Sequence, residues 1–415
     1  MTQLTERTTP DPRGPIPSAE DAEAYVALVC FKHGPPERIG VELEWTLHHH
    51  GRPERPLDPD LLASALGCHA PPTLCPETSA GPLPNGSLVT VEPGGQVEMS
   101  TLPHRSLGEL LPAVEDDLRH LDSLLQQSGL ARGTTGIDPH RPPARLLEVP
   151  RYTAMQAYLD SRGPWGSSMM CSTASIQVCL DAGDATDLAL RWRTLHSIGP
   201  ALVALFANSP VAHGVRTGWA SNRLRATLGT CPPFTHPVRC DDPVGAWVER
   251  VMTAPVMSVR RTHGDWVPRR PMSFADWLAG AAPDEAPPTY DDLDYHLSTL
   301  FPPVRPRGYV EVRYLDAQPD GRWHHPVLLL DALLSSTDVA ERACEIAGDT
   351  AALVDPWETA ARRGLDDPAL RAAARQLVDL AGDHLDPSVD EDVACLAWDL
   401  LDRRTALDPA RRQSA

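Results

Sequence analysis

Two glutamates at alternate positions, Glu42 and Glu44, are the residues whose spacing most clearly suggests chemistry. In residues 39–47, apolar side chains alternate with Gly, Glu and Thr, a period-two pattern that predicts a strand with one apolar face. Both carboxylates would then lie on the other face, about 6.5–7 Å apart along the strand. Two like charges on one sheet face are costly unless they meet water, a cation or a ligand. Fixed carboxylates that can share hard cations are what phosphoryl chemistry requires.

A second acidic segment carries Glu92 and Glu98 around the Pro-Gly-Gly sequence of residues 93–95. Proline has no N–H to donate and glycine tolerates positive φ, so we predict a bulge or turn in a strand here. Such a kink can aim the two carboxylates at one point from different heights. Taken alone, the segment would more often be an edge strand with two glutamates facing solvent.

Arginine accompanies glutamate further along the chain. A predicted strand over residues 309–315 places Glu311 and Arg313 on one face, as a metal ligand beside a phosphate ligand or as a surface ion pair. Arg223 and Arg225 are two positions apart, which suits a clamp for carboxylate or phosphate groups. An ordinary exposed pair is the alternative in a chain so rich in arginine.

Residues 169–181 form a further predicted strand with two distinct faces. One face carries Cys171, Thr173 and Gln177; it is polar but nearly uncharged and suits contact with a substrate. Cys171 as a nucleophile is the sharper alternative. Because no histidine or basic residue neighbours it in sequence, a thiol that packs or merely lines the site is favoured.

Helices and loops must hold these strands in place. Amphipathic spacing predicts three helices, over residues 21–31, 106–128 and 184–206. The second has Ser106 as its N-terminal cap and Glu109 as the reciprocal capping partner. Irregular structure is predicted for residues 67–87, and short helices with loops for residues 256–307. Ala, Leu, Asp and Arg dominate from about residue 326, which predicts a helical C-terminal cap.

Neither the histidines nor the cysteines indicate a metal site. The run His48 to His50 resembles a metal tract, but adjacent side chains diverge, so we predict a solvated hairpin loop. The nine cysteines are odd in number, scattered and never spaced as Cys-x-x-Cys. Reduced cytoplasmic thiols are the simpler interpretation of this pattern.

Composition and charge narrow the class of protein. The 415 residues carry a formal net charge of −19, which argues against nucleic acid or an anionic membrane as a partner. Lys32 is the only lysine, and neither a P-loop nor a dinucleotide-binding glycine motif is present. No apolar run approaches transmembrane length, and residues 1–20 lack the core of a signal peptide. We therefore expect a soluble, cytoplasmic protein.

We expect a single catalytic domain, although the length alone would allow two or three. The candidate site residues extend from Glu42 to Arg313 and would have to converge. The predicted organisation is a disordered lead-in over 1–20, one domain over 21–405 that includes the helical cap, and a loose tail over 406–415. The sequence does not set the oligomeric state, and a monomer is favoured.

In combination, these segments resemble the glutamate–cysteine ligase family, in its plant-like and actinobacterial branch, and are most similar to the ligases that open ergothioneine biosynthesis. The matching pieces are Gly-Val-Glu-Leu-Glu-Trp at 40–45, Glu-Pro-Gly-Gly-Gln-Val-Glu-Met-Ser at 92–100, Met-Met-x-x-Thr-x-x-x-Gln-Val-x-Leu-Asp at 169–181, Phe-Ala-Asn-Ser-Pro at 206–210, Ser-x-Arg-x-Arg at 221–225 and Glu-Val-Arg-Tyr-Leu-Asp at 311–316. They follow the family's order over about two thirds of the chain. Each motif is weak alone, and the ordered set is specific.

The resemblance implies an α+β fold like the catalytic domain of glutamine synthetase, with a curved, mostly antiparallel sheet forming a funnel and helices packed outside. It implies that Mg²⁺ on ATP and glutamate is held by Glu42, Glu44, Glu92, Glu98 and Glu311. It implies that the catalytic arginines are Arg313, at the transferred phosphate, and Arg223, and that the substrates contact Arg225, Gln177, Thr173 and Cys171. Two departures from the family pattern concern Ser172, where plant relatives carry arginine, and Thr227 with Cys231, where an aromatic residue and Asp before Pro are expected.

The implied reaction uses ATP and Mg²⁺ as cofactors and L-glutamate and L-cysteine as substrates. ATP would phosphorylate the γ-carboxylate of glutamate, and the amine of cysteine would then displace phosphate to give γ-glutamylcysteine. A ligase with a different amine acceptor is one alternative, and a non-catalytic glutamate-binding relative is another. The presence of all five matching glutamates argues against the non-catalytic alternative.

Overall fold

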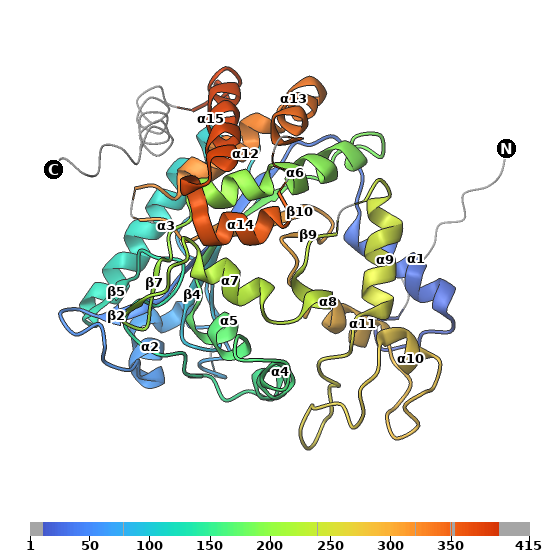
Figure 1. Cartoon of the computed structure of the whole chain (residues 1–415). Coiled ribbons are helices and arrows are strands. Elements are labelled where there is room, and N and C mark those ends of the chain that lie inside the picture. Colours follow the sequence, from blue (N-terminus) through green and yellow to red (C-terminus); the bar gives the residue numbers. More distant parts are fainter. Residues whose placement is uncertain are drawn as a thin grey trace.

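A six-stranded sheet, antiparallel throughout, forms the centre of the molecule (Figure 1). Its strands lie in the order β3-β4-β1-β6-β10-β9. Along the chain they are β1 (Ile39–Trp45), β3 (Leu88–Val91), β4 (Val97–Ser100), β6 (Ser175–Leu180), β9 (Val304–Pro306) and β10 (Val310–Asp316). The computed structural model describes residues 11–389 apart from 78, 239, 320, 349, 351 and 352. Segments far apart in sequence therefore meet in one sheet.

The two faces of β1 differ as the alternation predicts. Val41 and Leu43 are each 1% exposed, whereas Glu42 and Glu44 on the opposite face are partly exposed. Burying an aliphatic side chain of this size contributes about 1.5–3 kcal/mol relative to leaving it in water. The apolar face thus fixes the orientation of the strand, because a slip of one residue would bury both carboxylates in the core.

One layer of helices covers the apolar side of the sheet. Helix α6 (Leu188–Phe206) packs on β10, with Trp192 and Phe206 fully buried. Helices α13 (Thr337–Gly348), α14 (Pro356–Arg363) and α15 (Pro368–Gly382) pack on α6 in turn, and α12 (His324–Leu333) packs on α15 (Figure 1). The predicted C-terminal cap is therefore a helical layer that begins at His324.

The remaining helices are α1 (Ala19–Cys30), α2 (Pro59–Leu66), α3 (Leu107–Gln127), α4 (Pro150–Asp160), α5 (Gly166–Ser172), α7 (Asn222–Leu228), α8 (Pro232–Thr235), α9 (Pro243–Thr253), α10 (Phe274–Leu278) and α11 (Tyr290–Leu297). Of these helices, α4, α5 and α7 border the polar face of the sheet, and α9 packs on α6. Two short two-stranded sheets pair β2 (Leu47–His49) with β5 (Leu130–Arg132) and β7 (Val211–Ala212) with β8 (Val215–Arg216).

The predicted long helices are present with shifted ends. Helix α6 begins four residues later than predicted, at Leu188. The Ser106 hydroxyl caps α3 by accepting the N–H of Glu109, as predicted. The Glu109 carboxylate accepts the N–H of Arg105 instead of that of Ser106, so the reciprocal bond falls one residue early. Helix α1 begins at Ala19, earlier than predicted.

The strand predicted over residues 169–181 is wrong in its first part. Residues 166–172 form helix α5, and β6 begins only at Ser175. The Gln96 side-chain amide donates to the carbonyls of Met170 and Thr173, at 3.2 and 3.0 Å, and holds this helix end. Because that contact comes from a distant segment, the local alternation of residue types could not reveal it.

The solvated loop predicted for the histidine run is also wrong for two of its residues. His48 and His49 belong to β2, which pairs with β5, and they are 8% and 7% exposed. The His48 ring hydrogen-bonds the Thr46 hydroxyl at 3.0 Å, and burial lowers the pKa of His48 to about 4. His48 is therefore a neutral core residue, and His49 is buried beside it in the strand.

A tight turn joins β3 and β4, as predicted from the Pro-Gly-Gly sequence. Gly95 has a φ of +87°, and the Glu92 N–H donates to the Gln96 carbonyl at 2.8 Å. A Cβ on Gly94 would lie 2.1 Å from the carbonyl oxygen of Cys171. Glycine is therefore needed at both positions, for different reasons, and the turn is seated against α5.

The predicted fold class is confirmed: an α+β fold with a mostly antiparallel sheet and helices packed outside it. Within the predicted lead-in, Ile16 is buried. Residues 1–10 and the predicted tail over 406–415 lie outside the described residues. No helix of the described part is long and apolar enough to span a membrane.

Candidate active site

The polar face of the sheet forms the floor of a cavity of about 460 Å³. Helices α4, α5 and α7 and the segment 298–303 contribute its walls. Of the residues predicted from the sequence, those that line the cavity are Glu42, Glu44, Glu92, Glu98, Thr173, Gln177, Arg223 and Arg313. Carboxylates and arginines from separate strands and a helix thus meet at one place.

Pairing across the sheet sets the carboxylates side by side. Glu44 of β1 lies opposite Glu98 of β4, and Glu42 lies opposite Gln177 of β6. The Gln177 side-chain amide donates to Glu98 at 3.3 Å, and the Ser175 hydroxyl donates to Glu44 at 2.9 Å. Neutral donors therefore orient these carboxylates without neutralising them.

The cavity raises the pKa of all four lining carboxylates. Burial raises the pKa of Glu42 to about 8, and the charges of Glu311 and Glu98 add to the effect. Burial and the charge of Glu92 raise the pKa of Glu44 to about 8 and that of Glu98 to about 7. The pKa of Glu92 is also raised, chiefly by burial. Added positive charge would favour the ionised form of every one of these groups.

The donors available in this group are of the kind that Mg²⁺ takes. Glu42, Glu44, Glu92 and Glu98 offer only oxygen, the ligand that this hard ion prefers. One carboxylate oxygen each of Glu42 and Glu311 and the sulfur of Cys179 also lie within 4.8 Å of one another. Burial holds the pKa of Cys179 well above its usual value, so this thiol stays protonated. The residues present therefore fit a hard divalent cation.

Glu311 is in a different state from the other glutamates. It is 0% exposed, and Arg305 of β9 donates two hydrogen bonds to it, at 2.6 and 3.1 Å. Arg313 donates another at 2.8 Å. Burial alone would raise the pKa of Glu311, but the two arginines outweigh it and lower the pKa to about 2. Glu311 therefore stays ionised. A cation that binds it would have to share its carboxylate with these arginines.

Arg313 faces the cavity from the same strand. Burial would lower the pKa of its guanidinium, but Glu311 and Glu42 outweigh that effect and raise it. Its Nη1 also contacts the side-chain oxygen of Gln177. A permanently charged arginine therefore stands beside the carboxylates, where it could meet a phosphate oxygen.

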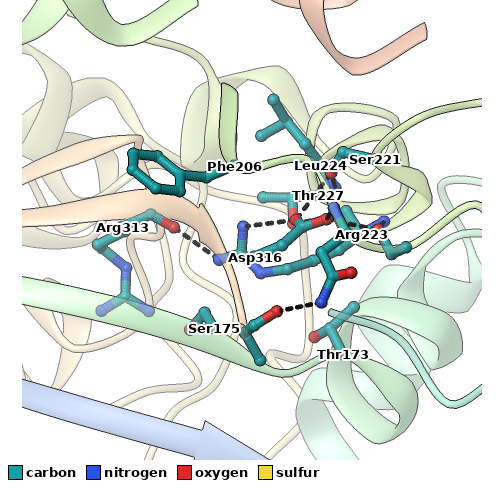
Figure 2. A network of polar contacts seen from close by, with 12 residues as sticks. Thr173, Ser175, Phe206, Ser221, Arg223, Leu224, Thr227, Arg313 and Asp316 are labelled. Carbon is teal, nitrogen blue, oxygen red and sulfur yellow. Dashed lines mark hydrogen bonds and ion pairs between the residues drawn. The ribbon is translucent and has the colours of Figure 1, made fainter. Parts of the chain in front are cut away.

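Arg223 projects into the cavity from the first turn of α7 (Figure 2). Its Nη2 donates to the Arg313 carbonyl at 2.6 Å. Its Nη1 has no hydrogen-bond partner among the described residues, although the side chain is only about 7% exposed. A buried N–H left unpaired costs roughly 1–3 kcal/mol. A substrate oxygen at Nη1 would recover that energy.

Two predicted substrate residues lie outside the lining of this cavity. Arg225 is sandwiched between Trp165 and Trp219, with its guanidinium carbon 4.4 and 4.7 Å from the two ring centroids. Cys171 is buried in α5, and burial raises the pKa of its thiol to about 12. Neither side chain therefore faces the carboxylates of this cavity.

Sequence reasoning missed several residues that line the cavity. The polar ones are Ser100, Arg151, Tyr152, Ser298, Arg305, Arg307 and Tyr309. Arg305 and Arg307 flank a proline just before the predicted strand with Glu311, a spacing that could have drawn attention. Arg151 carries no local signal of this kind. It is held by stacking on Tyr295, 4.8 Å from the ring centroid.

The chain matches the family model described as glutamate-cysteine ligase family 2 (GCS2) over residues 38–409. It is 37% identical to glutamate–cysteine ligase EgtA of Mycolicibacterium smegmatis over 402 residues, which cover 94% of this chain and 90% of that protein. EgtA of Mycobacterium tuberculosis is 36% identical over 417 residues, 94% and 91% of the two chains. The chloroplastic glutamate–cysteine ligase of Arabidopsis thaliana is 29% identical over 404 residues, 93% and 74% of the two chains.

A solved structure shares the fold. The glutamate–cysteine ligase of Francisella tularensis, crystallised in complex with AMP, superposes with a TM-score of 0.51 at 14% identity, over 90% of this chain and 82% of that one. The family match and the curated relatives define an enzyme of the ligase class. The chain belongs to glutamate–cysteine ligase family 2, which confirms the family that the sequence motifs predicted.

Proposed function

We propose that this enzyme joins the γ-carboxylate of L-glutamate to the amine of L-cysteine in an ATP- and Mg²⁺-dependent reaction, giving γ-glutamylcysteine for ergothioneine biosynthesis. One observation carries the proposal: four carboxylates with raised pKa values share a single cavity with Arg223 and Arg313. A site with surplus carboxylates and cavity-facing arginines suits a polyanion bound with divalent cations.

The cation would be held by Glu42, Glu44, Glu92 and Glu98, with Glu311 as a further ligand. Bound Mg²⁺ would neutralise charge on the phosphates of ATP. Arg313 would contact the transferred phosphoryl group, because its guanidinium is fixed by Glu311 beside the cavity floor. Arg223 would contact a phosphate or a substrate carboxylate through its unpaired Nη1. Thr173 and Gln177 would contact substrate or ions from the α5–β6 segment.

The proposed chemistry has two steps. An oxygen of the glutamate γ-carboxylate attacks the γ-phosphorus of ATP, and the bond from that phosphorus to the bridging oxygen breaks. ADP is the leaving group, and γ-glutamyl phosphate stays in the cavity. The cysteine amine then attacks the acyl carbon, phosphate departs, and the amine loses a proton. Arg223 and Arg313 would supply fixed positive charge to the phosphoryl group during its transfer. Fixed charge is most effective at the place where negative charge develops in the transition state.

A ligase with another amine acceptor is the second candidate. Met155, Met169, Met170 and Phe301 line part of the cavity wall. Such a surface accepts a thiol, but it would also accept other small apolar side chains. This part of the wall comes from helix and loop segments, outside the carboxylate-bearing sheet.

Coupled ADP release separates these candidates. Purified protein with ATP, MgCl₂, L-glutamate and L-cysteine should release ADP, and mass spectrometry should detect γ-glutamylcysteine. A panel of other amino acids, including L-alanine, L-serine and L-2-aminobutyrate, provides the comparison. If cysteine were no better than the others, the proposed acceptor would be wrong. If no amine supported ADP release, the ligase reaction itself would be wrong.

Cellular location and assembly stay predictions. Among the described residues, seven cysteines are free thiols, which is consistent with the cytoplasmic location inferred from the sequence: Cys30, Cys68, Cys171, Cys179, Cys231, Cys240 and Cys344. A monomer is expected, and size-exclusion chromatography with light scattering tests it. The net charge of −19 continues to argue against nucleic acid and anionic membranes as partners.

A further inference from the structure

A buried carboxylate outside the cavity lining controls the surroundings of Arg223. Asp316, the last residue of β10, is 2% exposed. Its Oδ2 accepts the N–H of Asn208 at 2.8 Å and the hydroxyl of Ser209 at 2.7 Å, and its Oδ1 accepts the hydroxyl of Ser221 at 2.8 Å. Figure 2 shows Asp316 beside Ser221 and Arg223. Burial raises the pKa of Asp316, and these three donors together with the charge of Arg223 act against that rise by favouring the ionised carboxylate.

The same hydroxyls bind the turn of helix that carries Arg223. The Ser209 hydroxyl accepts the backbone N–H of Arg223 at 3.1 Å. Ser221 is the N-terminal cap of α7, and its hydroxyl accepts the N–H of Leu224 at 3.1 Å. Each serine thus donates to Asp316 and accepts from α7. Through the two serines, this carboxylate ties the first turn of α7 to the end of β10.

The carboxylate also has little room to move. A Cβ on Gly136 would lie 2.6 Å from the Cγ of Asp316, so only glycine permits this approach. The Gly136 N–H donates to the Asn208 carbonyl at 3.1 Å and holds the segment in place. Asp316 is therefore fixed by backbone on one side and by hydroxyls on the other.

The direct contact between Asp316 and Arg223 is close but not a hydrogen bond. Arg223 Nη1 lies 3.9 Å from Asp316 Oδ1. At that distance the carboxylate offsets part of the cost of burying the guanidinium charge, yet it leaves the N–H of Nη1 free. Arg223 Nη2 is meanwhile held by the Arg313 carbonyl. One end of the guanidinium is anchored and the other is available.

We propose that Asp316 is a positioning residue for Arg223: through Ser209, Ser221 and its own charge, it holds Nη1 toward an anionic oxygen of the bound substrate. The inference rests on the proposed function in one respect, since that oxygen would belong to an ATP phosphate or the glutamate carboxylate. It also gives a joint role to three of the sequence motifs. The motif at 206–210 contains Asn208 and Ser209, the motif at 221–225 contains Ser221 and Arg223, and the motif at 311–316 ends in Asp316.

A double-mutant cycle of Asp316→Asn and Arg223→Ala tests this role, with kcat and KM measured for each substrate. Arg223→Ala should lower kcat/KM by a factor on the order of 10²–10³, as removal of an electrostatic contact does. Asp316→Asn should lower it by about 10–100-fold, the range seen when the partner that orients a functional side chain is lost. The double variant should be no worse than Arg223→Ala alone. Equal losses from Asp316→Asn in both backgrounds would overturn the proposal.

Asp117→Asn is the matched control for a purely structural effect. Asp117 of α3 is buried like Asp316, and it accepts hydrogen bonds from Asn85 and from the Ser87 N–H, away from the cavity. This variant should lower the thermal midpoint and leave kcat/KM unchanged. If it lowered kcat/KM as much as Asp316→Asn, general destabilisation would explain both results and the proposal would be wrong.

Binding measurements keep the inference separate from the proposed reaction. If the wild-type protein releases no ADP, the double-mutant cycle can be measured by binding. Calorimetric titrations with ATP and with L-glutamate, each in MgCl₂, give a dissociation constant for the wild type and for each variant. Asp316→Asn should then weaken binding of the ligand whose affinity Arg223→Ala lowers. Unchanged affinity in Asp316→Asn, with a clear loss in Arg223→Ala, would overturn the proposal even though the reaction had already failed.

Discussion

Glutamates in and beside the cavity are in opposite electrostatic states. Glu42 and Glu44 of β1 line the cavity and form its glutamate side, whereas Glu311 of β10 lies against the lining arginines Arg305 and Arg313 and forms with them the arginine side. Glu42 and Glu44 on β1 have pKa values raised to about 8 by burial and by other carboxylates. Glu311 on β10 has a pKa lowered to about 2, because Arg305 and Arg313 bond it despite its burial. All three belong to one sheet. The difference shows that the Glu311 carboxylate already has positively charged partners in the folded protein. The carboxylates of the glutamate side lack enough positive charge to keep their pKa values low.

This contrast assigns the two sides different contributions to stability and function. Surplus carboxylates destabilise the folded chain and are found where a protein binds charge, since perturbed pKa values cluster at functional sites. The Arg305–Glu311–Arg313 group is satisfied internally and can serve as a rigid support. Removal of one carboxylate should therefore have opposite effects on stability on the two sides.

Glu311→Gln should produce the largest loss of folding free energy. Removing one partner of a buried ion pair costs about 3–5 kcal/mol, because the remaining charge stays buried and uncompensated. Glu44→Gln, the matched change on the other side, should leave the protein equally or more stable in metal-free buffer, since it removes a carboxyl group whose ionised form is costly to bury among other carboxylates. Urea unfolding monitored by circular dichroism measures both. Similar destabilisation of the two variants would remove the distinction between the sides.

Glu42→Ala should produce the largest loss of activity on the glutamate side. We expect kcat/KM to fall by a factor on the order of 10²–10³ at saturating MgCl₂, as loss of one electrostatic contact does. Glu42→Gln keeps the volume of the side chain and should lose nearly as much, because its charge is gone. Turnover close to that of the wild type in Glu42→Ala would rule out Glu42 as a cation ligand.

Added Mg²⁺ should stabilise the glutamate side specifically. A ligand that binds only the folded state at 100 times its dissociation constant contributes about 2.7 kcal/mol. The thermal midpoint should rise with MgCl₂, return to its starting value with EDTA, and not respond to NaCl at matched ionic strength. In Glu44→Gln the rise should be much smaller. An equal rise with NaCl would mean that general screening, and not a bound cation, relieves the repulsion.

The sequence was enough to place the carboxylates, because strand periodicity sets the side on which each residue lies. In β1 it put Glu42 and Glu44 on one face, and in β10 it did the same for Glu311 and Arg313. It could not find the partner of Glu311. Arg305 lies in a strand of three residues, and only the register between β9 and β10 sets it opposite Glu311. Contacts set by register between distant strands leave little local signal.

The paired arginines show a second limit of sequence reasoning. Side chains two positions apart converge on one face of a strand, but they diverge on a helix. Residues 222–228 form helix α7, so Arg223 faces the cavity while Arg225 stacks between two tryptophans. In α5, similarly, contacts from Gln96 favoured a helix where four residues of alternation suggested a strand. Short segments are decided by their distant neighbours.

The pH dependence of stability should differ in sign between the two sides. Glu42, Glu44 and Glu98 have folded pKa values of about 7 to 8, above the usual 4.5 of an unfolded chain, so the folded state binds more protons in that interval. Stability without metal should therefore fall as pH rises from about 4.5 to 8, by up to about 1.4 kcal/mol per pH unit for each proton. Glu311 contributes the reverse: its stabilisation is lost as pH falls below 4.5 toward 2.

Urea unfolding across this pH range, with and without MgCl₂, measures that dependence. Bound Mg²⁺ should flatten the fall between pH 4.5 and 8, because it keeps the carboxylates ionised in the folded state. In Glu44→Gln the metal-free slope should be shallower. A metal-free protein whose stability rose steadily up to pH 8 would contradict the raised pKa values on the glutamate side.

Arg225→Met should have the smallest effect, and it tests whether the functional site includes the second of the two paired arginines. Loss of its stacking on Trp165 and Trp219 should cost about 1–2 kcal/mol, the sum of two cation–π contacts of ordinary strength. Because the guanidinium lies outside the cavity lining, kcat/KM for ATP, glutamate and cysteine should stay within about twofold of the wild-type value, a free-energy change near zero. Arg223→Met, two positions away, is the matched variant and should lose activity severely. A comparable loss of activity in Arg225→Met would mean that the functional site includes Arg225 and the two tryptophans that stack on it.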